Sequence, residues 1–171
     1  VDPIAHGRPL MTNDKRGHGA SRGRPRPLDY RFEEAATDLL GVLDAADLTV
    51  PIDFAGSSFG AAAALYAVLA APQRFRRLAL VIPPVSWETG ADQQRQWYFD
   101  TADLIDSIGP AAWRQQWLTP PLPNFADYPQ GKFTPAIHDD IASGALRGVD
   151  ASDLPDSGLL RSISQPTLIP A

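Results

Sequence analysis

The chain has 171 residues, of which 44% are hydrophobic and 20% charged, and its formal net charge is −5. This length and composition predict a single soluble globular domain with a substantial core. The negative charge argues against nucleic-acid binding. The sequence contains no cysteine, which excludes disulfides, thiol catalysis and cysteine-ligated zinc, and leaves the redox compartment open.

The amino terminus, residues 1–10, lacks the apolar segment of a signal peptide, so we expect a cytoplasmic protein. Residues 54–72 are long enough for a membrane span, but they are mostly alanine and contain glycine and serine. They favour a buried element of a soluble domain, and no membrane partner is expected. The chain starts at Val1, and its last run, 165–171, looks unfinished, so we expect an excerpt of a longer protein.

The first third of the chain contains three predicted elements in succession. Residues 8–14 predict a strand, and residues 15–29, rich in glycine, proline and arginine, predict a loop. Apolar residues at helical spacing over 32–43 predict a helix, for which Asp29 is a candidate N-cap.

Strand and helix then alternate. Residues 49–56 contain β-branched and aromatic residues typical of a strand, and residues 59–71 are alanine-rich and apolar nearly all round, which predicts a buried helix. Residues 76–84 form a continuous apolar run, as expected of a strand covered on both faces. This alternation predicts right-handed crossovers and a parallel sheet.

The next region differs in character. It spans residues 85–160, contains all four tryptophans, and has helical segments at 91–108, 110–117 and 134–143. The closing residues 165–171 again predict a strand. The intervening region therefore predicts a helical insertion between two strands of the sheet.

The junction between the predicted strand and the alanine-rich helix has the sequence GSSFG, residues 56–60, and matches G-x-S-x-G. The pattern alone is weak, because it arises by chance in roughly one chain of this length in twenty. Its context is the strand, sharp turn and helix that a nucleophile elbow needs. Ser58 is then the candidate nucleophile, and Ser57 a bystander. The alternative is a simple strand-to-helix turn with a serine cap.

A second motif precedes this junction. Residues 13–21, NDKRGHGAS, resemble the D-x-R-G-H-G-x-S signature of α/β-hydrolase-fold proteins, with Asp14, Arg16, Gly17, His18, Gly19 and Ser21 matching. The resemblance covers most of the chain apart from the insertion. It implies a partial α/β-hydrolase fold, truncated at both ends, with an incomplete core at 1–84 and 161–171 and a helical cap at 85–160.

The resemblance also implies a function. The expected protein is a serine hydrolase that forms an acyl-enzyme with an ester, lactone or related small acyl substrate, and it needs no cofactor and no metal. Ser58 would attack the carbonyl, the Phe59 backbone N–H would belong to the oxyanion hole, and Gly56 and Gly60 would make room for the turn.

The partners of Ser58 are not evident in the sequence. The catalytic acid and histidine are expected beyond residue 171, with Glu88 or Asp92 as a less favoured acid. His18 belongs to the family motif, where this histidine is structural. His138, followed by two aspartates, predicts a surface helix face rather than a metal site.

Three tryptophans of the insertion, Trp87, Trp97 and Trp113, are candidates to line an apolar acyl pocket over Ser58. The alternative is that most of them form the insertion's own small core. The fold does not decide the chemistry, so a non-catalytic binding protein or inert fragment, a peptidase, a cofactor-free peroxidase and a C–C hydrolase remain alternatives. The substrate and the oligomeric state are left open.

Overall fold

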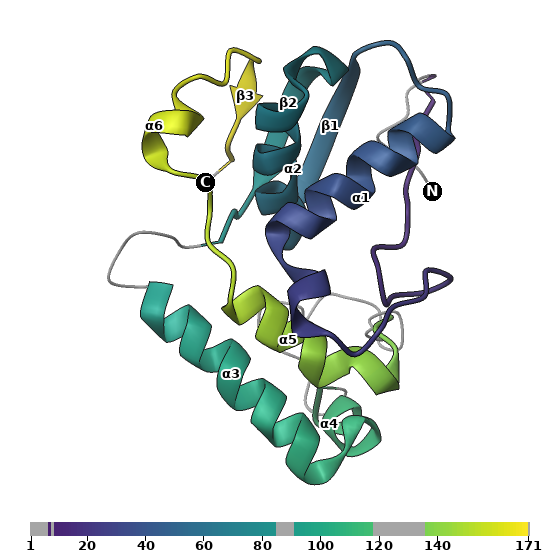
Figure 1. The fold of residues 1–171 in the computed structure, drawn as a ribbon, viewed down its shortest axis with the longest axis vertical. Coiled ribbons are helices and arrows are strands. Elements are labelled where there is room, and N and C mark those ends of the chain that lie inside the picture. Colours follow the sequence, from purple (N-terminus) through teal and green to yellow (C-terminus); the bar gives the residue numbers. More distant parts are fainter. Residues whose placement is uncertain (1–6, 8, 85–90, 118–135, 171) are drawn as a thin grey trace.

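The computed structural model describes residue 7 and residues 9–84, 91–117 and 136–170. Within these ranges three parallel strands form one sheet in the order β1-β2-β3 (Figure 1). The strands are β1 (Ile52–Ser57), β2 (Phe75–Val81) and β3 (Thr167–Leu168). The α/β fold and the parallel sheet predicted from the sequence are therefore confirmed.

Two helices, α1 (Phe32–Ala45) and α2 (Phe59–Ala70), pack on one face of the sheet (Figure 1). The alanine-rich α2 contacts β1, β2 and α1, which explains why it is apolar nearly all round. Short 3₁₀ turns precede α1 and β2 at Pro27–Tyr30 and Pro72–Arg74. The main core contains side chains from α1, α2 and β2 together with Leu154, and among them Leu43, Val68 and Leu80 are fully buried.

The opposite face of the sheet is open among the described residues. Along β1 half-buried and exposed residues alternate, and in β2 Arg76, Arg77 and Val81 are exposed. Arg76 binds Asp53 through two hydrogen bonds of 2.7 and 2.6 Å on this solvated side. The expectation of a strand covered on both faces is therefore wrong for β2, because the described helices that pack on the sheet lie on one side of it.

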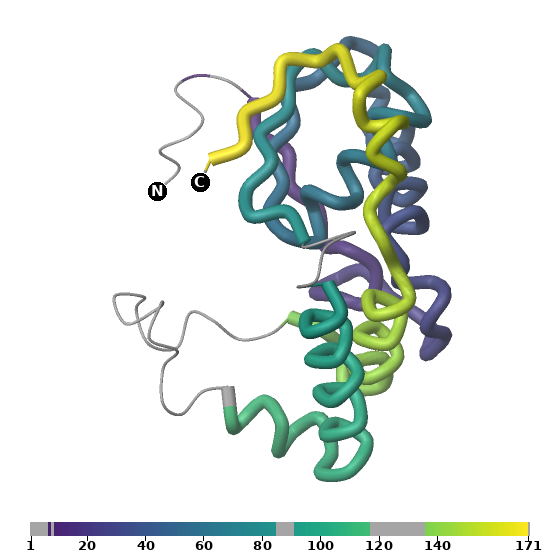
Figure 2. The backbone as a smooth tube through the Cα atoms, turned by 90° about the vertical axis from the view of Figure 1, so that its left-hand side faces the viewer, coloured from purple at the N-terminus to yellow at the C-terminus, as the bar shows by residue number. Residues whose placement is uncertain are grey.

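A second group of helices faces the carboxyl ends of β1 and β2 (Figure 1). It contains α3 (Ala91–Ile108), α4 (Pro110–Trp117) and α5 (Ala142–Asp150), followed by the short α6 (Ser157–Leu160), which lies beside the sheet. Helices α3 and α5 lie side by side, and α4 lies at the end of the molecule away from the sheet (Figures 1 and 2). None of the helices in the described ranges is long and apolar enough to cross a lipid bilayer.

Helix α5 begins later than the sequence predicted. The expected helix at 134–143 is replaced by an extended segment at 136–138, a 3₁₀ turn (Asp139–Ile141) and then α5. The extended segment pairs with the loop around His18: the Gly19 N–H donates to the Ala136 carbonyl at 2.9 Å, and the His138 N–H donates to the Gly17 carbonyl at 2.8 Å. Backbone groups used in this pairing cannot form a helix.

The predicted strand at 8–14 is also absent, since the described residues 9–14 have no regular secondary structure and pair with no described strand. A strand needs a hydrogen-bonded neighbour for its backbone groups, and no described segment lies against these residues in that way. The local sequence pattern predicted a strand but contains no information on the partner that a strand needs.

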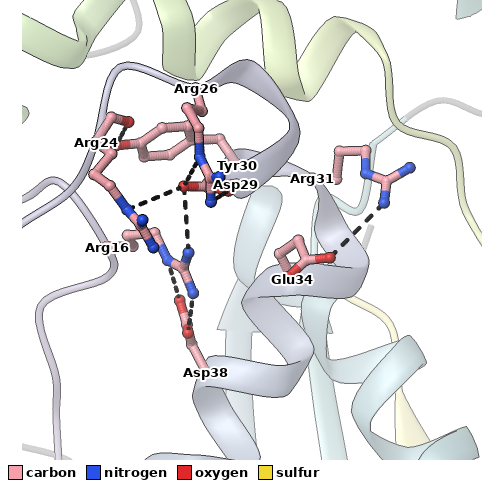
Figure 3. A network of polar contacts seen from close by, with 8 residues as sticks. All are labelled: Arg16, Arg24, Arg26, Asp29, Tyr30, Arg31, Glu34 and Asp38. Atoms are coloured by element: carbon pink, nitrogen blue, oxygen red, sulfur yellow. Dashed lines mark hydrogen bonds and ion pairs between the residues drawn. The ribbon is translucent and has the colours of Figure 1, made fainter.

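A polar network attaches the loop after residue 14 to α1 (Figure 3). The Arg16 guanidinium donates two hydrogen bonds to Asp38 on α1, at 2.9 and 2.5 Å, and lies 3.8 Å from Asp29. Asp29 accepts two further bonds from Arg26, which lower the pKa of its carboxyl. The predicted capping role of Asp29 is therefore wrong: the N-cap of α1 is Arg31, and Asp29 instead binds arginines.

Candidate functional site

Ser58 lies at the turn between β1 and α2, directly after the last residue of the strand. Its backbone has φ 49° and ψ −114°, a conformation that residues with a Cβ avoid. Such strain costs on the order of 1–3 kcal/mol and persists only where the surrounding structure enforces it, most often at functional sites. Ser58 is half-buried, whereas Ser57 is exposed as the last residue of β1.

The hydrogen bonds between Ser58 and the other described residues involve its backbone and not its hydroxyl. The Ser58 N–H donates to the Val81 carbonyl at 2.9 Å, and the Ser58 carbonyl accepts from Ala61 and Ala62 at 2.9 and 3.1 Å. The hydroxyl makes no capping hydrogen bond to α2, although Ser58 occupies the N-cap position. This geometry counts against the alternative in which the serine serves only as a helix cap.

Helix α2 begins at Phe59, so its first N–H groups have no partner within the helix. These groups carry the positive end of the helix dipole, next to the Ser58 side chain. The arrangement suits a developing negative charge, and the Phe59 N–H is the first of these groups.

The two glycines of the motif are not equivalent. A Cβ at Gly56 would lie 2.6 Å from the Gly60 carbonyl oxygen and 2.8 Å from a ring carbon of Phe54. A Cβ at Gly60 would meet no described atom within 4 Å. Only Gly56 is therefore needed for the close approach of α2 to β1, and the expectation that Gly60 also makes room is not supported.

Ile82 is a second strained residue at this edge of the sheet, and sequence reasoning missed it. It follows Val81, the acceptor of the Ser58 N–H, and its φ is 39°, which is rare for a β-branched residue. Its side chain is 66% exposed. Nothing in the apolar run of β2 indicates this conformation, because it arises only where the strand ends beside the Ser58 turn.

The loop that carries the second sequence motif is ordered by its own contacts. Asp14 accepts the Ala20 N–H at 2.8 Å, and Gly17 and Gly19 have positive φ values of 73° and 52°. The φ of Gly19 favours glycine, and a Cβ there would lie 2.3 Å from an oxygen of Asp14 and displace its carboxylate. The side chain of Lys15, from the same loop, reaches α2, with Nζ 4.4 Å from the centroid of the Phe59 ring.

The two described histidines, His18 and His138, each form a hydrogen bond with a backbone carbonyl of this loop. His18 lies 3.0 Å from the Arg16 carbonyl through Nδ1, and because a carbonyl only accepts, Nδ1 carries the proton. Desolvation lowers the pKa of His18 to about 4. His138 likewise donates from Nε2 to the Gly19 carbonyl at 2.8 Å, so the prediction that it lies on a surface helix face is wrong.

No described histidine or carboxylate forms a hydrogen bond with the Ser58 hydroxyl. Asp92 lines an open groove of about 410 Å³ that also includes Phe99 and Asp150 but not Ser58, so its role as the acid gains no support. Glu88 lies outside the described residues. A smaller cavity of about 10 Å³, lined by Phe32, Pro84 and their neighbours, does not include Ser58 either.

The three tryptophans predicted to line a pocket have different surroundings. Trp113 is buried and packs with Ile105 and Ala142 in the small core of the helical group, as the alternative interpretation expected. Trp97 lies on α3, is 47% exposed and contacts the Tyr98 ring edge-on at 5.1 Å. Trp87 lies outside the described residues.

The parallel sheet and its flanking helices define an α/β protein. At the carboxyl edge of this sheet, the protein presents a serine side chain from a strained turn between a strand and a helix. The profile of the α/β hydrolase fold family matches residues 1–118, and the chain belongs to this family. The motif around residues 14–21 and the GSSFG junction both lie within the matched range. The resemblance inferred from the sequence is thereby confirmed.

Solved structures similar to this chain include an esterase from Thermogutta terrifontis, with 22% identity and a TM-score of 0.67 over 91% of this chain and 58% of that one. A hydrolase from Pseudomonas aeruginosa PA01 has 27% identity and a TM-score of 0.59, with the same coverage. An enol-lactonase from Burkholderia xenovorans LB400 has 24% identity and a TM-score of 0.65 over 91% and 59%. Among curated proteins no relative matches the chain.

The chain thus spans less than two thirds of the length of these solved structures. The fold of the chain is partial in this sense, and the described strands form only one portion of such a sheet.

Proposed function

We propose that the chain carries the nucleophile of a serine hydrolase that acts on an ester, lactone or related small acyl substrate. The observation that carries the proposal is the conformation of Ser58, whose strained backbone holds, between β1 and α2, a hydroxyl with no hydrogen-bond partner among the described residues. In a member of the α/β hydrolase fold family, this turn corresponds to a nucleophile elbow.

In the proposed reaction the Ser58 Oγ attacks the substrate carbonyl and forms a covalent acyl-enzyme, which water then hydrolyses. The Phe59 N–H, at the start of α2, stabilises the oxyanion of the tetrahedral intermediate. A serine needs a base and an orienting acid, which in this fold follow the nucleophile in the order acid, then histidine. We place both outside the described residues and expect them after residue 171.

We also propose that α3, α4 and α5 belong to a cap over the carboxyl edge of the sheet. These helices face the ends of β1 and β2, where Ser58 lies (Figure 1). The cap is attached to the core through the pairing of residues 136–138 with the loop at 17–19. Trp97, exposed on α3, remains a candidate for the wall of an acyl pocket in a small-molecule site.

The main alternative is a protein that uses the same fold for binding, or for another reaction such as peptide, peroxide or C–C chemistry. The esterase and enol-lactonase named above favour acyl substrates over these alternatives, but at 22% and 24% identity they support the fold more strongly than the chemistry. Activity at Ser58 is the property that separates a hydrolase from a binding protein.

The test is active-site labelling of the full-length protein with a fluorophosphonate, located by peptide mass spectrometry. We expect modification of Ser58, no modification in Ser58→Ala, and unchanged modification in Ser57→Ala, which removes the neighbouring exposed hydroxyl. Ester hydrolysis should fall by several orders of magnitude in Ser58→Ala alone. Full esterase activity in Ser58→Ala would refute the assignment.

A further inference from the structure

We propose that the Lys15 ammonium recognises an anion beside Ser58, and that the site takes acyl substrates with a carboxylate at the far end of the acyl chain. The proposal rests on the serine-hydrolase function proposed above, and it adds the substrate class. It starts from the contact between Lys15 and the residue that follows the candidate nucleophile.

The ammonium lies over one aromatic ring, which in turn packs against a second. Lys15 Nζ lies 4.4 Å from the centroid of the Phe59 ring, and Phe32 packs against that ring edge-on, with the centroids 5.4 Å apart at 71°. Because Phe59 directly follows Ser58, the ammonium lies at most about 13 Å from the Ser58 Cα. A substrate attacked by Ser58 would therefore extend within reach of this charge.

The charge of Lys15 has no carboxylate partner among the residues that the structure describes. Three acids of the same loop and of α1 are already engaged. Asp14 accepts the backbone N–H of Ala20, whereas Asp29 and Asp38 bind Arg16. The contact with Phe59 orients the ammonium through the negative face of the ring but does not neutralise it.

The ammonium is charged at pH 7 although it is partly withdrawn from water. Desolvation lowers the pKa of Lys15 to about 8, which leaves the group protonated at pH 7, while the residue as a whole is exposed to solvent. A positive charge without a carboxylate partner among the described residues attracts anions locally, even in a chain with a net charge of −5. A carboxylate that binds there gains a charge-assisted hydrogen bond.

Two esters of equal chain length separate the charge from the apolar contacts: 4-nitrophenyl hydrogen glutarate, which ends in a carboxylate, and 4-nitrophenyl pentanoate, which ends in a methyl group. Their binding is measured on the full-length protein carrying Ser58→Ala, so that the measurement does not depend on turnover. We expect the glutarate ester to bind about 10-fold more tightly than the pentanoate.

Three further substitutions in the same background test the residue. Lys15→Met retains a flexible apolar stem over Phe59 and should abolish the preference, whereas Lys15→Arg should retain it. Arg22→Met removes an equal charge from an exposed position of the same loop and should leave the preference intact. The proposal would be overturned if the preference for the glutarate ester survived in Lys15→Met, or if it were absent with Lys15 present. Lys15 would then only pack against the Phe59 ring.

Turnover of both esters by the protein with Ser58 intact is measured separately, with correction for spontaneous hydrolysis. If a Lys15-dependent preference is found but Ser58 does not turn over either ester, the hydrolase proposal fails and the anion site is supported. If both esters are turned over without a Lys15-dependent preference, the hydrolase proposal is supported and the anion site is refuted.

Discussion

The backbone N–H of Ser58 donates a hydrogen bond to the carbonyl oxygen of Val81, with 2.9 Å between nitrogen and oxygen. This bond joins the residue after β1 to the last residue of β2, at the carboxyl edge of the sheet. Ser58 on one side of the bond and Ile82 just beyond the other both have positive φ. The strain is therefore concentrated where the two strands end together.

The strain at Ser58 should be measurable as a difference between two variants that both lack the hydroxyl. Ser58→Ala keeps a Cβ at φ 49°, whereas Ser58→Gly removes it, so we expect the glycine variant to be more stable than the alanine variant by about 1 kcal/mol. Urea denaturation of both variants gives the difference. A glycine variant less stable than the alanine variant would show that the turn is not strained.

The two motif glycines should respond differently to alanine. Gly56→Ala places a methyl group 2.6 Å from a backbone oxygen of α2 and should lower the free energy of unfolding by roughly 2 kcal/mol or more. Gly60→Ala meets no described atom within 4 Å and has a helical position, so stability should stay the same or rise by up to about 1 kcal/mol. Denaturation midpoints of the pair provide the comparison, and equal losses would contradict it.

The stability of the chain should depend on the protonation of His18. Desolvation lowers its pKa to about 4 from an ordinary value of 6.5, so between these values the unfolded chain binds more protons than the folded one. Stability attributable to His18 is then present above about pH 6.5 and is lost as the pH falls toward 4. Since the ring is only half-buried, we expect a loss of about 1–2 kcal/mol.

The corresponding control is His18→Gln, which cannot titrate in this range. Unfolding free energies measured from pH 7 to pH 4 should fall less steeply for this variant than for the unmodified chain. Parallel curves for the two proteins would show that His18 does not contribute to the pH dependence.

Replacing the buried Trp113 should lower stability more than replacing the partly exposed Trp97. Trp113→Ala leaves a cavity beside Ile105 and Ala142 and should cost about 3–5 kcal/mol of stability. Trp97→Ala removes a side chain that is 47% exposed and should cost about 1 kcal/mol, with any effect appearing in acyl chain-length preference. Thermal melts and a series of esters of increasing length give both quantities, and a larger loss of stability for Trp97 would contradict the assignment.

Most of the helices and strands could be predicted from the sequence, because hydrophobic periodicity and residue propensity act over a few residues. Helices α3 and α4 begin and end where the pattern placed them, and α1, α2 and the three strands lie within a few residues of their predicted bounds. The position of Ser58 between a strand and a helix follows from the same local signals.

The sequence alone did not reveal contacts between distant segments. The open face of the sheet, the late start of α5 and the place of His138 against the loop at 17–19 depend on which segments pack together. A local sequence pattern does not indicate which segment, more than a hundred residues away, will pack against it.

The same distinction applies to the candidate site. The sequence by itself determined the residue types: a serine between glycines after a strand, and a motif loop with Lys15 one position before Arg16. Only the tertiary structure decided that Ser58 is held in a strained conformation by Val81, and that the Lys15 ammonium lies over Phe59 without a carboxylate among the described residues. These features arise because folding brings the ends of two strands and one loop to the same edge of the sheet, and packing there outweighs local backbone preference.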